Sequence, residues 1–351
     1  MSEKRVCLAY SGGLHRRYVG QSEDFEAVEK KALALGAERM VIENLQQEFV
    51  DEFIFRAIQC HRMVALLSCG NRLLARQVRF ELAWKACDPS LSIIAPWREP
   101  KFFNRFQGRK DLLDFAKEHN IPVSSTPKAP WSMDGILERI EQAPPKELWK
   151  RTVDPLDAPD KPTNFSISFE KGIPVKVEVD GETITGSLAI FKKLNDIGRD
   201  NGLKSRGCYD TPGLTIARLA HINLEGLVLD SKVRTLRDRY VTTEWSQCLY
   251  NGMYFSPERE FLENSIIFSQ KNVNGTVHMM AYKGNAYVLG RFSETSNLYS
   301  ETEASMDSLE GFSPEATSGF LTIQAIRLEK YGAAKIKEGE PLVGKHLVGK
   351  Q

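Results

Sequence analysis

The stretch Leu8-Ala9-Tyr10-Ser11-Gly12-Gly13-Leu14 decides the fold class expected for the first part of this 351-residue chain. The apolar run 6–10 predicts a buried strand, and Ser11-Gly12-Gly13 predicts a turn at its carboxyl end. Glycines allow positive φ angles and close approach of an anion, so the backbone N–H groups of this turn can converge on a phosphate, such as the pyrophosphate of ATP. An ordinary turn is the alternative, because the same residue types are common in turns of every kind.

Outward from this stretch, short apolar runs alternate with amphipathic helices over about the first hundred residues. This alternation is typical of an α/β domain with a parallel sheet. We expect further strands at 39–42 and 92–95. We expect helices from about Glu23 to Gly36, at 49–58 and at 112–119. The second of these carries one apolar stripe, formed by Phe49, Val50, Phe53, Ile54, Ala57 and Ile58.

The pattern changes after residues 128–162, which are rich in proline and predict an extended connection. Two antiparallel hairpins are expected, with Lys171-Gly172 and Lys283-Gly284-Asn285 as their turns. Further helices are expected at 188–197, 232–250, 258–269 and 320–331. The predicted domains are therefore an α/β domain at 1–127, the connection at 128–162, an α+β domain at 163–312, and a C-terminal helical arm and tail at 313–351.

Composition argues against several kinds of partner. The chain has 47 Lys and Arg against 46 Asp and Glu, so no large basic field favours nucleic acid or an anionic membrane, and we expect neither. The six cysteines are scattered without metal-ligand spacing, which predicts free thiols in place of disulfides or zinc sites. No secretion signal or bilayer-length apolar run is apparent, so a cytoplasmic protein is expected.

The motif at residues 9–14 resembles the pyrophosphate loop of the N-type ATP pyrophosphatases. Beyond it, the chain is similar to the argininosuccinate synthases in segments that follow in the same order over most of its length. These segments are residues 20–26, 77–82, 94–98, 104–106 with 108–109, 126–128, 131–134, 204–207, 209–213, 255–257, 289–291 and 317–320.

The resemblance implies a fold and a reaction. The fold is a nucleotide-binding domain of the N-type ATP pyrophosphatase kind, then an α+β synthetase and multimerisation domain, and the expected assembly is a homotetramer. The reaction is the ATP- and Mg²⁺-dependent condensation of citrulline with aspartate, through a citrullyl-adenylate, with release of AMP and pyrophosphate. Positioning and charge stabilisation can accomplish most of this chemistry, so we assign no catalytic residue and no metal ligand.

Site residues follow from the resemblance one position at a time. The family's ATP-binding loop matches Ala9, Tyr10, Ser11, Gly12, Gly13 and Leu14. Arg79 falls where the family has a substrate-binding arginine, and a guanidinium suits a bidentate grip on a carboxylate. Ser132 and Tyr209 fall at citrulline-contacting positions. Without the resemblance, Arg79 would be interpreted as a helix-surface arginine, Ser132 as a loop hydroxyl and Tyr209 as a half-buried aromatic.

Four segments of the family pattern are missing. His15-Arg16-Arg17 stands where the family has Asp-Thr-Ser, at the start of the helix that faces the phosphates. Between Cys60 and Gln77, a tyrosine-containing helix and a glycine-rich loop for ATP and aspartate are absent. A serine-bearing segment is absent after Asp134, and a segment holding a citrulline-binding glutamate is absent before Lys204.

Two alternatives to an active synthase stay open, and the missing segments motivate the first. The first is a pseudoenzyme, a non-catalytic assembly partner that joins tetramers of a complete synthase through its second domain and arm. The second is an ATP pyrophosphatase that acts on another acceptor, such as an RNA base or another amide. The near-neutral charge argues against an RNA substrate.

Overall fold

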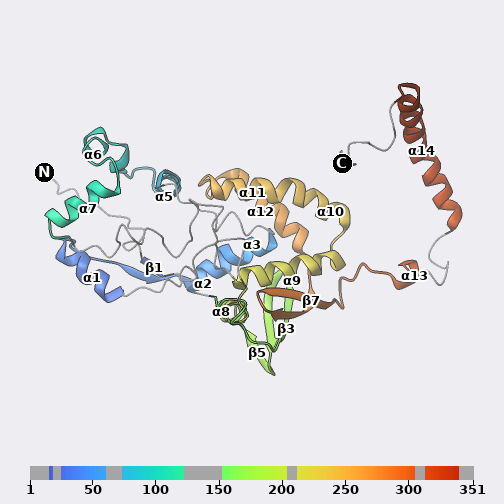
Figure 1. The fold of residues 1–351 in the computed structure, drawn as a ribbon, viewed down its shortest axis with the longest axis horizontal. Helices are drawn as coiled ribbons and strands as arrows, with labels where there is room; N and C mark the ends of the chain where they lie inside the picture. Colours follow the sequence, from blue (N-terminus) through green and yellow to red (C-terminus); the bar gives the residue numbers. More distant parts are fainter. Residues whose placement is uncertain are drawn as a thin grey trace, which may run out of the picture. The chain divides into compact units, whose positions relative to one another are not determined.

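The computed structural model describes residues 16–18, 25–60, 73–121, 152–203, 212–304 and 313–339 (Figure 1). The chain divides into two compact units, residues 1–297 and 298–351. The strand and turn expected at 6–13 lie outside the described residues. Within the described part, no helix is long and apolar enough to cross a membrane. The predicted domain boundaries stay predictions.

The first elements form a parallel β–α–β crossover. Strand β1 (Arg16–Tyr18) pairs in parallel with β2 (Ile42–Asn44), with Arg16 opposite Ile42. Helix α1 (Phe25–Ala34) connects them and is followed by Gly36 at φ 95°. This arrangement confirms the parallel pairing and the first helix. The strand expected at 39–42 was misplaced, because pairing with β1 begins only at its last residue.

The next helical segment is continuous through α2 (Gln46–Glu48), the π-helical turn η1 (Phe49–Ile54) and α3 (Phe55–Gln59). Its apolar stripe is confirmed, although Phe49 and Phe53 are only half-buried. The fully buried apolar members of the segment are Val50, Ile54, Phe55, Ala57 and Ile58. Most of them pack into the same core as the sheet described below.

Helix α5 (Leu73–Cys87) follows, and after it the strand expected at 92–95 is wrong. Residues 91–95 are irregular, with Ile94 60% exposed, and lead into the short helices η2 (Pro96–Arg98) and α6 (Pro100–Phe103). A short apolar run forms a strand only where a neighbouring strand pairs with it and buries it, and among the described residues none lies beside this one. Helix α7 (Arg109–Glu118) confirms the helix expected at 112–119.

The second half of the first unit is built on a five-stranded antiparallel sheet in the order β5-β4-β3-β6-β7. Both expected hairpins are confirmed. The strands are β3 (Thr163–Glu170), β4 (Ile173–Val179), β5 (Glu182–Thr185), β6 (Gly275–Tyr282) and β7 (Asn285–Phe292). The central strand β3 places Ile167 opposite Val177 on one side and Val277 on the other, and all three are buried.

Three hairpin turns of this sheet share one design. Each has a non-glycine residue followed by glycine, both at positive φ: Lys171-Gly172, Asp180-Gly181 and Lys283-Gly284. Positive φ at both central residues is the requirement of the type I′ turn, whose twist matches that of the flanking strands. These short turns fix the register of the pairs on either side of them.

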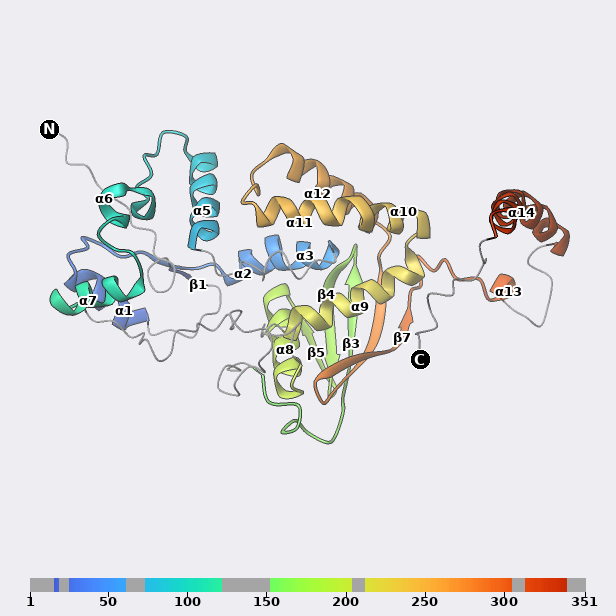
Figure 2. The same cartoon turned by 45° about the horizontal axis from the view of Figure 1, so that its top comes forward.

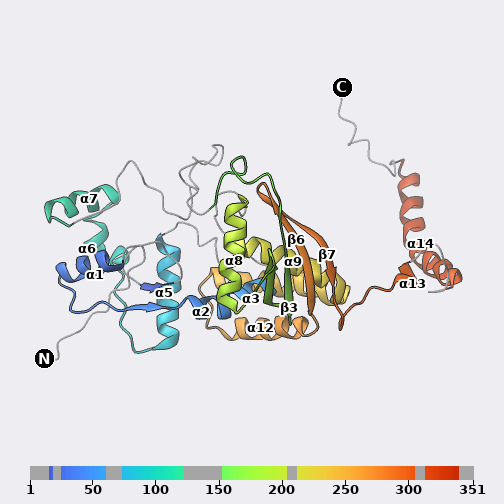
Figure 3. The same cartoon turned by 90° about the horizontal axis from the view of Figure 1, so that it is seen from below.

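Helices α8 (Ser187–Asp200) and α9 (Pro212–Val228) pack against each other, and α9 also contacts β3, β6 and β7 (Figures 2 and 3). The helix at 188–197 is confirmed, whereas α9 was not expected. Its polar residues, such as Arg218, His221 and Glu225, are buried or half-buried, so it lacks the exposed polar face that marks an amphipathic helix. Its buried residues include Leu214, Ile216, Ala217, Ala220, Leu224 and Val228.

A helical layer completes the unit. It comprises α10 (Ser231–Leu236), η4 (Arg237–Val241), α11 (Thr242–Tyr250) and α12 (Pro257–Gln270), confirming the helices expected at 232–250 and 258–269. Helices α11 and α12 lie side by side (Figures 1 and 2). Trp245 and Cys248 from α11 share a small core with Ile266 from α12 and with Cys60.

The second unit contains α13 (Glu301–Ala304) and α14 (Pro314–Lys337). The Ser313 hydroxyl accepts a hydrogen bond from the Glu315 N–H at 3.4 Å and so caps α14. The helix confirms and extends the one expected at 320–331. Its large apolar side chains are all exposed within this chain, namely Phe320, Leu321, Ile323, Ile326, Leu328, Tyr331 and Ile336.

Candidate active site

Arg79 on α5 is held by the carboxyl end of α11. Its Nε donates a hydrogen bond to the backbone oxygen of Tyr250 at 2.7 Å, and its guanidinium carbon lies 5.0 Å from the centre of the Tyr250 ring. The last carbonyls of a helix lack intrahelical partners and carry partial negative charge, so a guanidinium is well placed there. The ring adds a cation–π contact to the same group.

Gly252 allows α5 to come this close. The N–H of Met253 bonds to the Cys248 oxygen at 2.8 Å and that of Gly252 to the Leu249 oxygen at 3.3 Å, the two bonds of a Schellman motif that ends α11. Gly252 has φ 79°, as this motif requires. A Cβ atom added there would lie 3.0 Å from the Cα of Arg79, so a side chain would push α5 away.

One nitrogen of Arg79 has no partner in the part of the chain that the structure describes. Its Nη2 is buried and makes no hydrogen bond among the residues that the structure describes. A buried donor without an acceptor is costly, and a carboxylate oxygen would satisfy it with a charge-assisted hydrogen bond. The Tyr250 contacts therefore fix the guanidinium while leaving donor capacity for an anionic ligand.

A second arginine nearby shows what Arg79 lacks. Arg259 donates from Nε to the backbone oxygen of Tyr254 at 2.6 Å and lies 4.5 Å from the centre of that ring, the same arrangement as Arg79 with Tyr250. However, Arg259 also forms an ion pair with the carboxylate of Glu263 on its own helix. Arg79 has no such carboxylate within the described residues, which supports a ligand as the source of one.

Of the predicted site residues, only Arg79 lies in the described part of the chain. The predicted ATP loop at Ala9–Leu14, Ser132 and Tyr209 lie outside it, so their placement around Arg79 stays a prediction. Sequence analysis missed Tyr250 and Gly252. The glycine was detectable, because glycine after a helical pattern signals its end. The contact between Arg79 and Tyr250 was not, because nothing in the sequence links residues so far apart.

The described cysteines are free, with Cys60 and Cys248 buried and Cys87 exposed. Burial raises the pKa of the Cys60 thiol well above its ordinary value of 9.0 and raises that of Cys248 as well. Both thiols are therefore protonated at neutral pH and are poor nucleophiles. Within the described ranges, no three His, Cys, Asp or Glu side chains gather as metal ligands.

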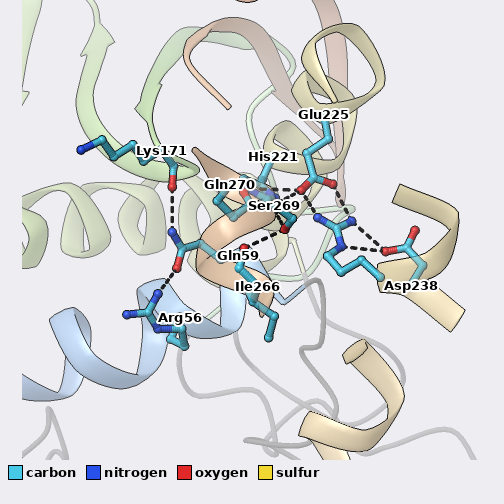
Figure 4. A network of polar contacts seen from close by, with 10 residues as sticks. Arg56, Gln59, Lys171, His221, Glu225, Asp238, Ile266, Ser269 and Gln270 are labelled. Atoms are coloured by element: carbon cyan, nitrogen blue, oxygen red, sulfur yellow. Dashed lines mark hydrogen bonds and ion pairs between the residues drawn. The ribbon is translucent and has the colours of Figure 1, made fainter. Parts of the chain in front are cut away.

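A buried polar network joins α9, α12 and η4 (Figure 4). The side-chain nitrogen of Gln270 donates to Glu225 Oε1 at 2.5 Å. The side-chain oxygen of Gln270 therefore faces His221 Nε2, at 2.7 Å. The Glu225 carboxylate binds both terminal nitrogens of Arg237, with Nη2 at 2.8 Å from Oε2. The Arg237 guanidinium also contacts Asp238 at 2.7 Å. His221, Glu225 and Gln270 are completely buried, so this network supports the framework and is inaccessible to substrate.

A separate set of polar contacts holds the first hairpin turn. Gln59 on α3 donates to the backbone oxygen of Lys171 at 2.7 Å, and Arg56 donates to the Gln59 side chain at 2.5 Å (Figure 4). The N–H of Gly172 bonds to the Val273 oxygen at 2.8 Å, just after α12. Polar contacts therefore fix the sheet turn against helices from both ends of the first unit.

Comparisons with known proteins agree with this organisation. The family model for the arginosuccinate synthase N-terminal HUP domain matches residues 15–69 and 69–122, and that for the C-terminal domain matches residues 131–331. The chain is 42% identical to argininosuccinate synthase of Saccharomyces cerevisiae, over 97% of this chain and all of the relative. It is 43% identical to that of Schizosaccharomyces pombe and 38% to that of Gallus gallus, with 95% and 94% of this chain and 98% and 97% of the relatives covered.

The comparisons also bear on the segments found missing from the sequence. The first alignment spans 418 positions, more than the 351 residues of this chain, so the relative has residues where this chain has none. Both family models nevertheless match, and together they cover most of the chain. The comparisons favour a ligase over the non-catalytic alternative.

Proposed function

The chain belongs to the argininosuccinate synthase family of ligases, and from this premise we propose that it joins citrulline to aspartate with ATP, Arg79 holding a substrate carboxylate. The observation that carries the role of Arg79 is its geometry. Tyr250 fixes the guanidinium, and the buried Nη2 lacks an acceptor within the described residues. A carboxylate of citrulline or aspartate would supply that acceptor.

The proposed reaction has two steps. The ureido oxygen of citrulline attacks the α-phosphate of ATP, forming citrullyl-adenylate and releasing pyrophosphate. The amine of aspartate then attacks the activated carbon, and AMP leaves as argininosuccinate forms. We propose that Ala9–Leu14 hold the ATP phosphates and that Ser132 and Tyr209 hold citrulline. We infer that positioning of the substrates accounts for most of the rate enhancement, in keeping with the protonated thiols of Cys60 and Cys248.

Mg²⁺ would enter with the nucleotide. A cation bound mainly through substrate phosphates keeps several waters and needs only one or two carboxylates from the protein. The absence of a three-ligand cluster from the described residues is compatible with that mode. When bound, the ion would neutralise charge on the phosphates.

We propose a homotetramer that works in the cytoplasm. The apolar side chains along α14 support association, because large exposed apolar patches mark surfaces that contact another protein. Sizing of the purified chain tests this assembly, and a monomer at micromolar concentration would contradict it.

The test of function is pyrophosphate release by the purified protein with Mg-ATP, citrulline and aspartate, omitting each amino acid in turn. We expect release that requires citrulline. Folded protein that releases no pyrophosphate would contradict the proposed reaction and favour the non-catalytic assembly partner.

The role of Arg79 is tested by Arg79→Gln, with Arg199→Gln as the matched control. Arg199 pairs with Asp196 and Asp200 on an exposed helix face, so its loss removes the same charge at little cost. We expect Arg79→Gln to raise the KM of one amino acid substrate by about 10- to 100-fold, the worth of one charge-assisted hydrogen bond of about 1.5–3 kcal/mol. Unchanged KM and kcat would refute the assignment.

A further inference from the structure

Gly226 on α9 lies beneath two arginine side chains from different elements. A Cβ atom added at Gly226 would lie 3.0 Å from Nη1 of Arg291 on β7 and 3.2 Å from Nη1 of Arg234 on α10. Both guanidinium groups therefore approach the same point on the helix surface. Glycine in a helix interior costs about 1 kcal/mol relative to alanine, and here it provides the space that these two cations occupy.

Neither cation is neutralised by the described residues. Arg291 Nη1 donates to the backbone oxygen of Asn223 at 2.6 Å and to its side-chain oxygen at 3.0 Å, and both acceptors are uncharged. Arg234 is half-buried, and its side chain makes no hydrogen bond or ion pair within the described ranges. Two like charges in close proximity repel each other unless an anion lies between or beside them.

Arg234 also borders a pocket of about 520 Å³. The pocket lies between α9 and the α10–η4 segment and is lined by Ile222, Arg234, Thr235, Asp238 and Arg239. Its one carboxylate, Asp238, is bound by Arg237 from the interior side. Arg234 and Arg239 therefore give this pocket a net positive charge, and Thr235 adds a hydroxyl.

We propose that this pocket binds a phosphate-bearing small molecule, with Arg234 as its principal contact and Arg239, Thr235 and Arg291 around it. Guanidinium groups form charge-assisted, often bidentate hydrogen bonds with phosphate oxygens. A volume of about 520 Å³ falls within the range of small-ligand pockets. The pocket shares no residue with the predicted ATP-binding and substrate-binding residues, so it is a second anion site.

The experiment is calorimetric titration of the full chain with inorganic pyrophosphate at constant ionic strength. Three variants are compared with the wild type: Arg234→Gln, Gly226→Ala and the control Lys232→Gln. Lys232 is exposed on the same helix as Arg234 and does not line the pocket, so its variant removes an equal charge nearby. Gly226→Ala leaves every charge in place, fills the space under the two guanidinium groups and favours the helix.

We expect Arg234→Gln and Gly226→Ala to lose one pyrophosphate site or to weaken it about tenfold or more, and Lys232→Gln to bind as the wild type does. Wild-type stoichiometry and affinity in Arg234→Gln would overturn the proposal, since all binding would then be at the nucleotide loop. Equal weakening in Lys232→Gln would overturn it in favour of general surface charge. A change in elution volume of Arg234→Gln on sizing would also overturn it, assigning these arginines to contact with another copy of the chain.

Discussion

Gly172 packs directly against the side-chain amide of Gln270. A Cβ atom at Gly172 would lie 2.1 Å from Gln270 Oε1 and 2.8 Å from His221 Nε2. The turn of the first hairpin is thus seated on the buried network that holds Glu225 and Arg237 (Figure 4). Gly172 therefore serves two purposes: it adopts the positive φ of the turn, and it leaves room for the Gln270 amide to make its buried hydrogen bonds.

Gly172→Ala is expected to destabilise the protein by about 2–4 kcal/mol. The added methyl group would both displace the Gln270 amide, an overpacking cost of about 1–3 kcal/mol, and sit at φ 73°, a left-handed strain of about 1 kcal/mol. The control is Gly181→Ala, at the same position of a like turn with φ 81° but with no atom within 4 Å of the added carbon. Denaturant unfolding should show a loss of only about 1 kcal/mol there. Equal losses would mean that the contact with Gln270 is immaterial.

Glu225→Gln is expected to cost about 3–5 kcal/mol, because it leaves the Arg237 guanidinium buried without its main counter-charge. Asp238→Asn removes the second carboxylate of the same arginine, but that side chain is 47% exposed. Its loss should therefore cost less than about 1 kcal/mol. Urea unfolding measures the free energy of unfolding of both variants. A larger loss of stability in Asp238→Asn would show that Asp238, and not Glu225, is the main partner of Arg237.

The hairpins and amphipathic helices could be predicted because each carries a local signal. Lys171-Gly172 and Lys283-Gly284 provide two-residue turns between alternating strands, and α3, α8 and α12 have one apolar side. Helix α9 could not be predicted in this way. It is covered by the sheet, α3 and α8, and its polar residues His221 and Glu225 are buried with its apolar ones, so no exposed polar face marks it as amphipathic.

The candidate site was less predictable than the fold. Arg79 was found only through resemblance, since a lone arginine on a helix carries no signal of its own. Its anchors are a backbone carbonyl and a ring at Tyr250, brought close by a glycine whose φ angle ends α11. The segments 92–95 and 39–42 fail as strands for a related reason, because pairing is decided by distant neighbours.

Tyr250 positions Arg79 through its ring and its backbone oxygen, so two substitutions separate its contributions. Tyr250→Phe keeps both groups and is expected to leave the steady-state kinetics unchanged. Tyr250→Leu removes the ring and should raise the KM of the substrate that Arg79 holds by about 2- to 5-fold, the worth of a cation–π contact of about 0.5–1 kcal/mol. If Tyr250→Phe raised this KM as much as Tyr250→Leu does, the Tyr250 hydroxyl and not the ring would be the group that positions Arg79.

The buried Cys60 thiol is expected to make the free energy of unfolding fall as the pH rises above about 9. Burial raises the pKa of its thiol well above 9.0, so the unfolded chain loses this proton first as pH rises. The stabilising contribution is thus complete below about pH 9 and is lost above it, by up to about 1.4 kcal/mol for each pH unit until the folded pKa is reached. Free energies of unfolding measured from pH 7 to pH 10.5 should therefore fall less steeply in Cys60→Ala than in the wild type.

Cys87→Ala is the control for this measurement, because it removes a thiol of the same kind from an exposed position. Cys60→Ala will have a lower baseline, since the missing sulfur leaves space in the core shared with Trp245 and Ile266. The comparison therefore rests on slopes and not on absolute free energies. Parallel slopes in Cys60→Ala and the wild type would show that the thiol meets the same environment in both states, and the buried position of Cys60 against α11 and α12 would be contradicted.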